Sequence, residues 1–247
     1  MLNWLNGERD FELEGTSRRV TGAFWQAEGA TSETPMVLMG HGASGDRYQA
    51  PIPHLAKRFT QESGFSVLAI DGPVHGLRQV GPGGREALAG EMQKPGFIAD
   101  MVTDWLDAYR AISSETGLGH GPLGYFGLSM ETIFGLPLLA SELDFTAATL
   151  GLAGTTKVGA PMAETLIGAA EQVSHPVLFL MQLEDELFDR DGYLILFDAL
   201  AAEDKRLHAN PGLHPEIPAE EISHTFDFLH AHLSGTATRR IVNPLAE

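Results

Sequence analysis

The chain has 247 residues, enough for one large α/β domain or two small ones. It contains no cysteine, which excludes disulfides, thiolate nucleophiles and cysteine-based metal sites. Its formal net charge of −17 disfavours nucleic acid and anionic membranes as partners. A solvated acidic surface accounts for this charge, and a salt-adapted source is the alternative. No apolar run is long enough to span a membrane and the first residues lack a secretory signal pattern, so we expect a cytoplasmic protein; an exported protein without cysteines is the alternative.

Short apolar runs alternate with amphipathic patterns along the whole chain. In chain order, the first half predicts a hairpin (11–15 and 18–27), a strand with a glycine-rich loop (35–45), a helix (52–64), a strand with a polar exit (65–76), a mobile surface segment (77–96), a helix (97–115) and a strand (121–130). The second half predicts a helix with a kink or an early end at Pro137 (131–142), a strand (145–154), a partly helical segment (155–174), a strand with an acidic loop (176–192), a helix (193–202), a strand and turn (205–215) and a closing helix (219–233).

Continuous apolar strands alternating with helices predict an α/β fold, with a mostly parallel sheet covered by helices on both faces. We expect a single domain over residues 1–247. Ligands of such sheets bind beyond the carboxyl ends of the strands, so functional residues should directly follow strands.

Ser129 lies between a predicted strand and a predicted helix, in the sequence Gly-Leu-Ser-Met-Glu. A sharp strand-to-helix turn is where hydrolases mount a nucleophilic serine, and Gly127 leaves room for such a turn. The alternative is an ordinary serine at a helix N-terminus. Glu131 replaces the small residue that usually closes this motif. We expect its side chain to point outward into solvent, where the first turn of a helix favours a carboxylate. The alternative is that it points at the site, where its charge would oppose an oxyanion.

The segment 39–46, Met-Gly-His-Gly-Ala-Ser-Gly-Asp, follows a predicted strand. A His-Gly pair at this place is typical of the loop that supplies an oxyanion donor, here the backbone amide of Ala43. The amide of Met130, at the helix start, is the expected second donor. A glycine-rich loop without a role is the alternative, and we expect His41 to form structural hydrogen bonds rather than act as a base.

Four carboxylates follow the strand predicted at residues 176–183: Glu184, Asp185, Glu186 and Asp189. We predict Asp185 as a catalytic acid, because a short side chain followed by an apolar pair is easily held rigid. Glu184 is the second candidate, and the other two are predicted to be solvated.

A base should follow the acid if the chain order is nucleophile, acid, base. We predict His214, because a loop histidine reaches across the strand ends, whereas His208 lies within the last strand. His224, His230 and His232 belong to the closing helix and are expected at the surface. No pair of histidines has the spacing typical of metal ligands, so we expect no metal.

With these residues placed, the chain resembles the α/β-hydrolase superfamily, and most closely its dienelactone-hydrolase-like esterase branch. The resemblance runs from "PMVLMGHGASG" through "SVLAIDGPVHG" and "GYFGLSM" to "PVLFLMQLEDELF" and "NPGLHPEIP". It implies Ser129 as nucleophile, Asp185 as acid and His214 as base, in an acyl-enzyme mechanism that cleaves small carboxylic esters without a cofactor. "DGPVHG" departs from the usual motif in having Val74 where the superfamily has glycine.

The candidate substrate contacts are His41, Gly42, Arg47, Arg78 and Phe188. For the arginines the alternative is that they pair with nearby acidic side chains. Residues 77–97 and 152–172 are the expected rim of the site, and both are too short for a full cap domain. We expect a small ester substrate, and a homo-oligomer is compatible with the sequence. The alternatives are a peptidase or thioesterase of the same fold, and a ligand-binding homologue with little turnover.

Overall fold

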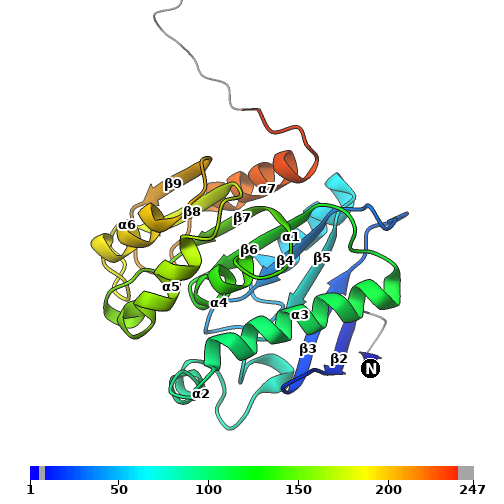
Figure 1. The fold of residues 1–247 in the computed structure, drawn as a ribbon, viewed down its shortest axis with the longest axis horizontal. Coiled ribbons are helices and arrows are strands. Elements are labelled where there is room, and N and C mark those ends of the chain that lie inside the picture. The colour runs from blue at the N-terminus through cyan, green and yellow to red at the C-terminus, as the bar shows by residue number, and fades with distance from the viewer. Residues whose placement is uncertain (6–8, 239–247) are drawn as a thin grey trace, which may run out of the picture.

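The computed structural model describes residues 1–5 and 9–238, which form a nine-stranded sheet in the order β1-β2-β3-β5-β4-β6-β7-β8-β9 (Figure 1). The strands are β1 (Leu2–Leu5), β2 (Asp10–Glu14), β3 (Arg19–Trp25), β4 (Met36–Gly40), β5 (Ser66–Ile70), β6 (Leu123–Leu128), β7 (Phe145–Gly151), β8 (Val177–Gln182) and β9 (Lys205–Asn210). The first three strands pair antiparallel, and β3 pairs antiparallel with β5. The strands β4 to β9 are parallel to one another. The predicted α/β fold with a mostly parallel sheet is confirmed.

Helices cover both faces of the sheet. They are α1 (Ile52–Arg58), α2 (Gly84–Glu91), α3 (Phe97–Thr116), α4 (Met130–Leu139), α5 (Ala163–Ala170), α6 (Arg190–Ala199) and α7 (Ala219–Leu233). One hydrophobic core joins α3, α4, α5 and α6 to one face, and a second core joins α1 and α7 to the other. Figure 1 shows α3, α4 and α5 in front of the sheet. The strands from β4 to β8 are buried almost throughout, which explains their uninterrupted apolar sequences.

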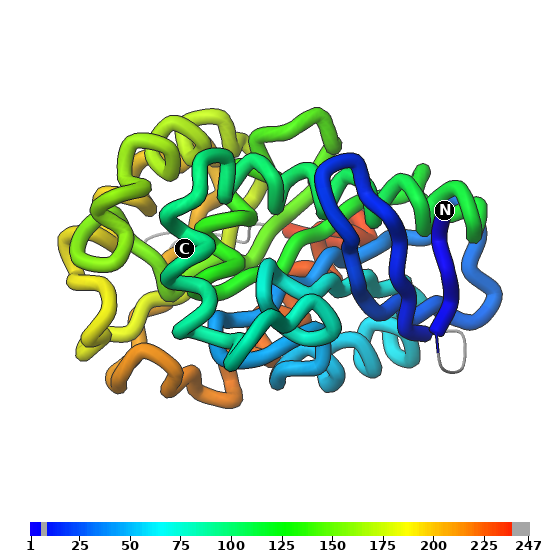
Figure 2. The backbone as a smooth tube through the Cα atoms, turned by 90° about the horizontal axis from the view of Figure 1, so that it is seen from below, coloured from blue at the N-terminus to red at the C-terminus, as the bar shows by residue number. Residues whose placement is uncertain are grey.

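Three local features differ from the sequence-based expectations. The strand β1 was not predicted; it pairs with β2 at the edge of the sheet (Figure 2). The segment expected to be a mobile surface stretch contains α2, which buries Leu88. The helix α4 includes Pro137 and ends two residues after it, at Leu139, whereas a kink or a short first helix was expected at the proline. Among the described residues, no helix is both long and apolar enough to cross a bilayer.

Candidate active site

The turn from β6 into α4 holds Ser129 in a conformation that few residues adopt. Its φ of 58° and ψ of −117° lie in a strained region for a residue with a side chain. The Ser129 amide donates to the carbonyl of Gly151 at 2.9 Å, which ties the turn to β7. A Cβ at Gly127 would lie 2.7 Å from the Tyr125 ring and 2.8 Å from the carbonyl oxygen of Glu131, so only glycine fits there. The packing of β6 and α4 therefore maintains the strained turn.

Ser129, His214 and Asp185 come from three distant parts of the chain and form a continuous set of hydrogen bonds. Ser129 Oγ lies 2.8 Å from Nε2 of His214, and Nδ1 of His214 lies 2.7 Å from Oδ2 of Asp185. His214 and Asp185 are both buried. The carboxylate fixes a proton on Nδ1, which leaves Nε2 as an acceptor for the serine hydroxyl. The structure thus brings together the three residues that the sequence predicted.

Three further groups, besides His214, orient the Asp185 carboxylate. Its Oδ1 accepts backbone N–H bonds from Leu187 at 2.7 Å and Phe188 at 3.0 Å, and its Oδ2 accepts the hydroxyl of Tyr193 as well as His214. Burial opposes ionisation of this carboxyl, but hydrogen bonds from His214, Tyr193 and the Phe188 amide outweigh it and hold the Asp185 pKa below its ordinary value. The carboxylate is therefore ionised at neutral pH.

The other acidic side chains after β8 are not merely solvated. Glu184 accepts the backbone N–H of Gly212, and Glu186 accepts that of His214 at 3.0 Å. The bond from the His214 amide lowers the pKa of Glu186. The expectation that Glu186 is only surface charge is thus corrected: both glutamates anchor the loop that carries the histidine. Asp189 caps α6 by accepting the Gly192 amide at 2.9 Å.

The loop after β4 brings Ala43 to the cavities at Ser129. Ala43 lines the cavities that adjoin Ser129, and no acceptor for its N–H or that of Met130 is found in the described part of the chain. The ring of His75 faces the Ala43 carbonyl with Nε2 at 3.0 Å and the Pro73 carbonyl with Nδ1 at 2.7 Å. This histidine ties the loop after β5 to the loop after β4 and orients the peptide that follows Ala43.

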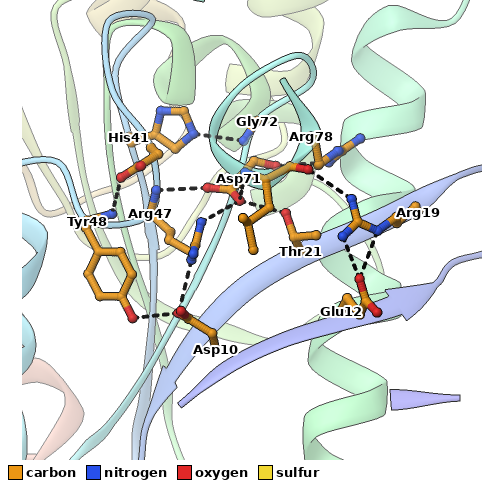
Figure 3. A network of polar contacts seen from close by, with 12 residues as sticks. Asp10, Glu12, Arg19, Thr21, His41, Arg47, Tyr48, Asp71, Gly72 and Arg78 are labelled. Atoms are coloured by element: carbon orange, nitrogen blue, oxygen red, sulfur yellow. Dashed lines mark hydrogen bonds and ion pairs between the residues drawn. The ribbon is translucent and has the colours of Figure 1, made fainter. Parts of the chain in front are cut away.

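His41 forms structural hydrogen bonds through both ring nitrogens. Nε2 accepts the Gly72 amide at 2.8 Å, and Nδ1 donates to the Gly42 carbonyl at 2.8 Å (Figure 3). Burial lowers its pKa to about 4, so the ring is neutral at physiological pH and its Nε2 lone pair is already used. His41 also lines a cavity beside Ser129, together with Gly42.

Arg47 and Arg78 hold these loops together and do not face the site. Figure 3 shows Asp71 at the centre of this network: its carboxylate accepts from Thr21 Oγ1 at 2.6 Å and from Arg47 Nη1 at 2.8 Å. Arg47 also pairs with Asp10 at 3.2 Å. Arg78 donates to the Asp71 carbonyl at 2.9 Å.

Neither arginine lines a cavity at Ser129. The expectation that Arg47 and Arg78 contact the substrate is therefore corrected, because burial of a guanidinium requires an internal partner and both have one. Arg85 in α2 is different. It is exposed, it lines both cavities at Ser129, and no ion pair for it is found within residues 1–5 and 9–238.

Two cavities meet at Ser129. One, of about 180 Å³, is almost wholly apolar, and its wall is formed by Ala43, Arg85, Leu88, Met92, Phe97, Ser129, Met130, Ile133, Phe134, Val158, Leu187 and Phe188. The expected contact Phe188 therefore lies in its wall. The other cavity, of about 120 Å³, extends toward the His41 loop and includes His214 and Gln49. The predicted rim segment 77–97 supplies Leu88 and Phe97 to the apolar cavity, and 152–172 supplies Val158.

The side chain of Glu131 is buried, so the expectation that it points into solvent is wrong. The Glu131 side chain lies against Gly40 of β4, and a Cβ added at Gly40 would be 2.2 Å from the Cγ of Glu131. Its Oε2 accepts from the Tyr125 hydroxyl at 3.0 Å and from Trp105 Nε1 at 3.3 Å. Its Oε1 has no hydrogen-bond partner among the described residues. Burial raises the Glu131 pKa to about 8, so this group is protonated at neutral pH and does not oppose an oxyanion electrostatically.

Sequence reasoning missed Tyr193, His75 and Gly40. Tyr193 follows the acidic loop in a helix pattern, and nothing local shows that its hydroxyl reaches Asp185. His75 carried a usable signal, since it stands in the "DGPVHG" turn after a strand. In the same turn Val74 has a φ of 60°, a region that favours the glycine usual at this position.

No protein-family model matches the chain, and no curated protein matches its sequence. Similar solved structures include a cold-adapted esterase from an Arctic intertidal metagenomic library, with a TM-score of 0.77 and 33% identity, covering 94% of this chain and 100% of that one. A zinc-bound form of that esterase gives a TM-score of 0.74, 33% identity and coverage of 94% and 99%.

An esterase from Pyrococcus furiosus has a TM-score of 0.66 at 15% identity, covering 94% of this chain and 97% of that one, which shows the fold alone. An acetyl xylan esterase from Paenibacillus has a TM-score of 0.68 at 15% identity, covering 94% and 88%. The 33% identity over the whole length of the Arctic esterase is the decisive comparison. The chain belongs to the esterases of the α/β-hydrolase fold.

Proposed function

We propose that this protein is a carboxylesterase that uses Ser129, His214 and Asp185 in an acyl-enzyme mechanism. The single observation that carries the proposal is the hydrogen-bonded series from Ser129 Oγ to His214 at 2.8 Å and from His214 to Asp185 at 2.7 Å. Membership of the esterases of this fold supports the same reaction class. Within the same proposal, residues 1–247 act as one domain and the segments 77–97 and 152–172 form the rim of its site.

In the first half of the reaction, Ser129 Oγ attacks the ester carbonyl and its proton passes to Nε2 of His214. Asp185 stabilises the imidazolium that forms and keeps Nδ1 protonated. The amides of Ala43 and Met130 donate to the oxyanion, and loss of one such donor typically costs about 2.7–4 kcal/mol of transition-state stabilisation. The imidazolium then protonates the leaving alcohol, and the acyl group remains on Ser129.

In the second half, His214 takes a proton from water, which attacks the acyl-enzyme carbonyl. Collapse of the second oxyanion breaks the bond to Ser129 Oγ, which recovers the proton from His214. The released products are a carboxylic acid and an alcohol. Only side chains and amides of this chain take part in these steps.

The shapes of the two cavities favour an ester with a short to medium apolar acyl chain. The cavity of about 180 Å³ has an almost wholly apolar wall and adjoins Ser129. Each methylene buried there contributes about 0.8 kcal/mol, close to a fourfold gain in kcat/KM, until the cavity is full. The dienelactone-hydrolase-like branch remains part of this proposal, and Arg85, beside both cavities, suits a substrate that also carries a carboxylate.

A fluorophosphonate probe tests the nucleophile directly, because it reacts with an activated serine. We expect labelling of the wild type and of the control Ser114→Ala, which removes an exposed serine of α3. Ser129→Ala should lose labelling and at least about 10³-fold of kcat on p-nitrophenyl butyrate. Absence of labelling in the folded wild type would instead support the low-turnover binding protein.

The reaction class is tested with matched ester, thioester and amide substrates of the same acyl group. We expect the ester to have the highest kcat/KM. A preference for the amide or thioester would favour the peptidase or thioesterase alternative. The same panel extended from acetate to decanoate reports how many methylenes the apolar cavity accepts.

A further inference from the structure

Three side chains with metal-binding chemistry converge on the side of the sheet covered by α7. His208 comes from β9, and Glu221 and His224 come from the first half of α7. One ligand atom from each lies within 4.8 Å of the others, which makes this the one such group of three found among the described residues. The spacing along the chain concealed this cluster, because strand and helix contribute to it separately.

Two of the three ligand-to-ligand distances are close to those around a tetrahedral Zn²⁺ ion, and the third, between the histidines, is within 4.8 Å. Oε2 of Glu221 lies 2.8 Å from Nδ1 of His208 and 3.4 Å from Nδ1 of His224. Zn–N and Zn–O bonds of about 2.0–2.2 Å in tetrahedral geometry separate neighbouring ligand atoms by roughly 3.4 Å. Small rotations of the side chains would therefore suffice for the three atoms to share one ion. Two imidazoles and a carboxylate are the ligand set of many zinc sites with a fourth position for water.

The carboxylate at the centre is buried and oriented. Glu221 is 4% exposed, and its second oxygen, Oε1, accepts from Asn210 Nδ2 at 3.3 Å. This bond directs Oε2 toward the histidines, as outer hydrogen bonds do for metal ligands. A cavity of about 230 Å³, lined by His208, His224 and Asp227, gives access from solvent. Arg206, the arginine in its wall, is paired with Asp204 at 2.8 Å.

We propose that His208, Glu221 and His224 form a Zn²⁺ site that joins β9 to α7. Nothing in the ester chemistry uses these residues. The ligands lie on both sides of the loop 211–218, which carries His214, so a bound ion ties together the two ends of that loop. The site thereby stabilises the closing helix and the loop against opening.

Calorimetric titration of EDTA-treated, dialysed protein with ZnCl₂ tests the proposal. We expect one ion per chain, with a Kd on the order of 1 µM or lower, and no binding of CaCl₂, which prefers oxygen ligands. His224→Ala and Glu221→Gln should each weaken binding by at least about tenfold. His54→Ala, which removes an exposed histidine of α1, is the matched control and should bind as the wild type does.

Thermal unfolding provides a second readout that does not depend on activity. Zn²⁺ at about one hundred times Kd should raise the Tm of the wild type and of His54→Ala by roughly 5–10 °C. His224→Ala should show little of this shift. Binding that persists in both ligand variants would overturn the proposal, as would no binding to the wild type. Binding that is lost only in His214→Ala would place the ion on the catalytic residues and would likewise overturn it.

Discussion

The buried acid beneath the nucleophile turn leads to a prediction about stability and pH. Replacing Glu131 by glutamine keeps the size of the side chain and its acceptor oxygen for Tyr125 and Trp105, but removes the ionisable proton. In the folded protein the pKa of Glu131 is raised to about 8, whereas its ordinary value is 4.5. Between these values the unfolded chain is ionised while the folded chain keeps its proton, so folding takes up a proton and stability falls as pH rises.

The magnitude follows from the size of the pKa change. Each pH unit between 4.5 and 8 removes about 1.4 kcal/mol of unfolding free energy from the wild type relative to Glu131→Gln, or about 5 kcal/mol in all. The contribution of Glu131 is fully present below pH 4.5, and its loss is complete above pH 8. Glutamine places an NH₂ group at the position of the unpartnered Oε1. The cost of leaving that group without an acceptor is the same at every pH, so it does not change the slope.

Urea denaturation at pH 5, 6, 7, 8 and 9 measures this difference. The difference in unfolding free energy between Glu131→Gln and wild type should grow steadily with pH up to about 8 and then level off. Glu164→Gln, an exposed glutamate in the first turn of α5, is the control and should track the wild type at every pH. If the Glu131→Gln difference is flat from pH 5 to 9, Glu131 is ionised in the folded protein and the reasoning is refuted.

Three further predictions concern the active site. Tyr193→Phe removes a hydrogen bond to the Asp185 carboxylate, and hydrogen bonds to charged groups contribute about 1.5–3 kcal/mol. We therefore expect kcat in steady-state assays to fall at least about tenfold. An unchanged kcat would show that Tyr193 does not position the carboxylate. Ile133→Phe narrows the cavity of about 180 Å³ and should move the optimum of the p-nitrophenyl ester series to shorter acyl chains, whereas an unmoved optimum would place the acyl group elsewhere. Arg85→Gln should lower kcat/KM about two- to fivefold for an ester that bears a free carboxylate, because an exposed ion pair contributes that little. The kcat/KM of the matched neutral ester should not change. Equal effects on both esters would exclude recognition of the charge by Arg85.

Much of the architecture could be predicted because the signals are local. The period of apolar residues determines whether a segment forms a buried strand or an amphipathic helix, and glycines mark where strands turn into loops. Parallel strands present their carboxyl ends at one edge, so Ser129, Asp185 and His214 could be assigned to one site without knowledge of distances. Short features such as β1 and α2 were missed because few residues carry their pattern.

The direction of a side chain and its partners depend on what packs opposite, and only the tertiary structure supplies that. Glu131 is buried because Gly40, some ninety residues earlier, leaves space for it, and Arg47 is turned inward because Asp71 and Asp10 are there to pair with it. The His208 cluster is visible only once β9 and α7 lie side by side. The sequence by itself determined the order of elements and the chemistry at the strand ends, since these rest on local periodicity. The structure decided which charges are buried, since burial depends on contacts between residues distant in the chain.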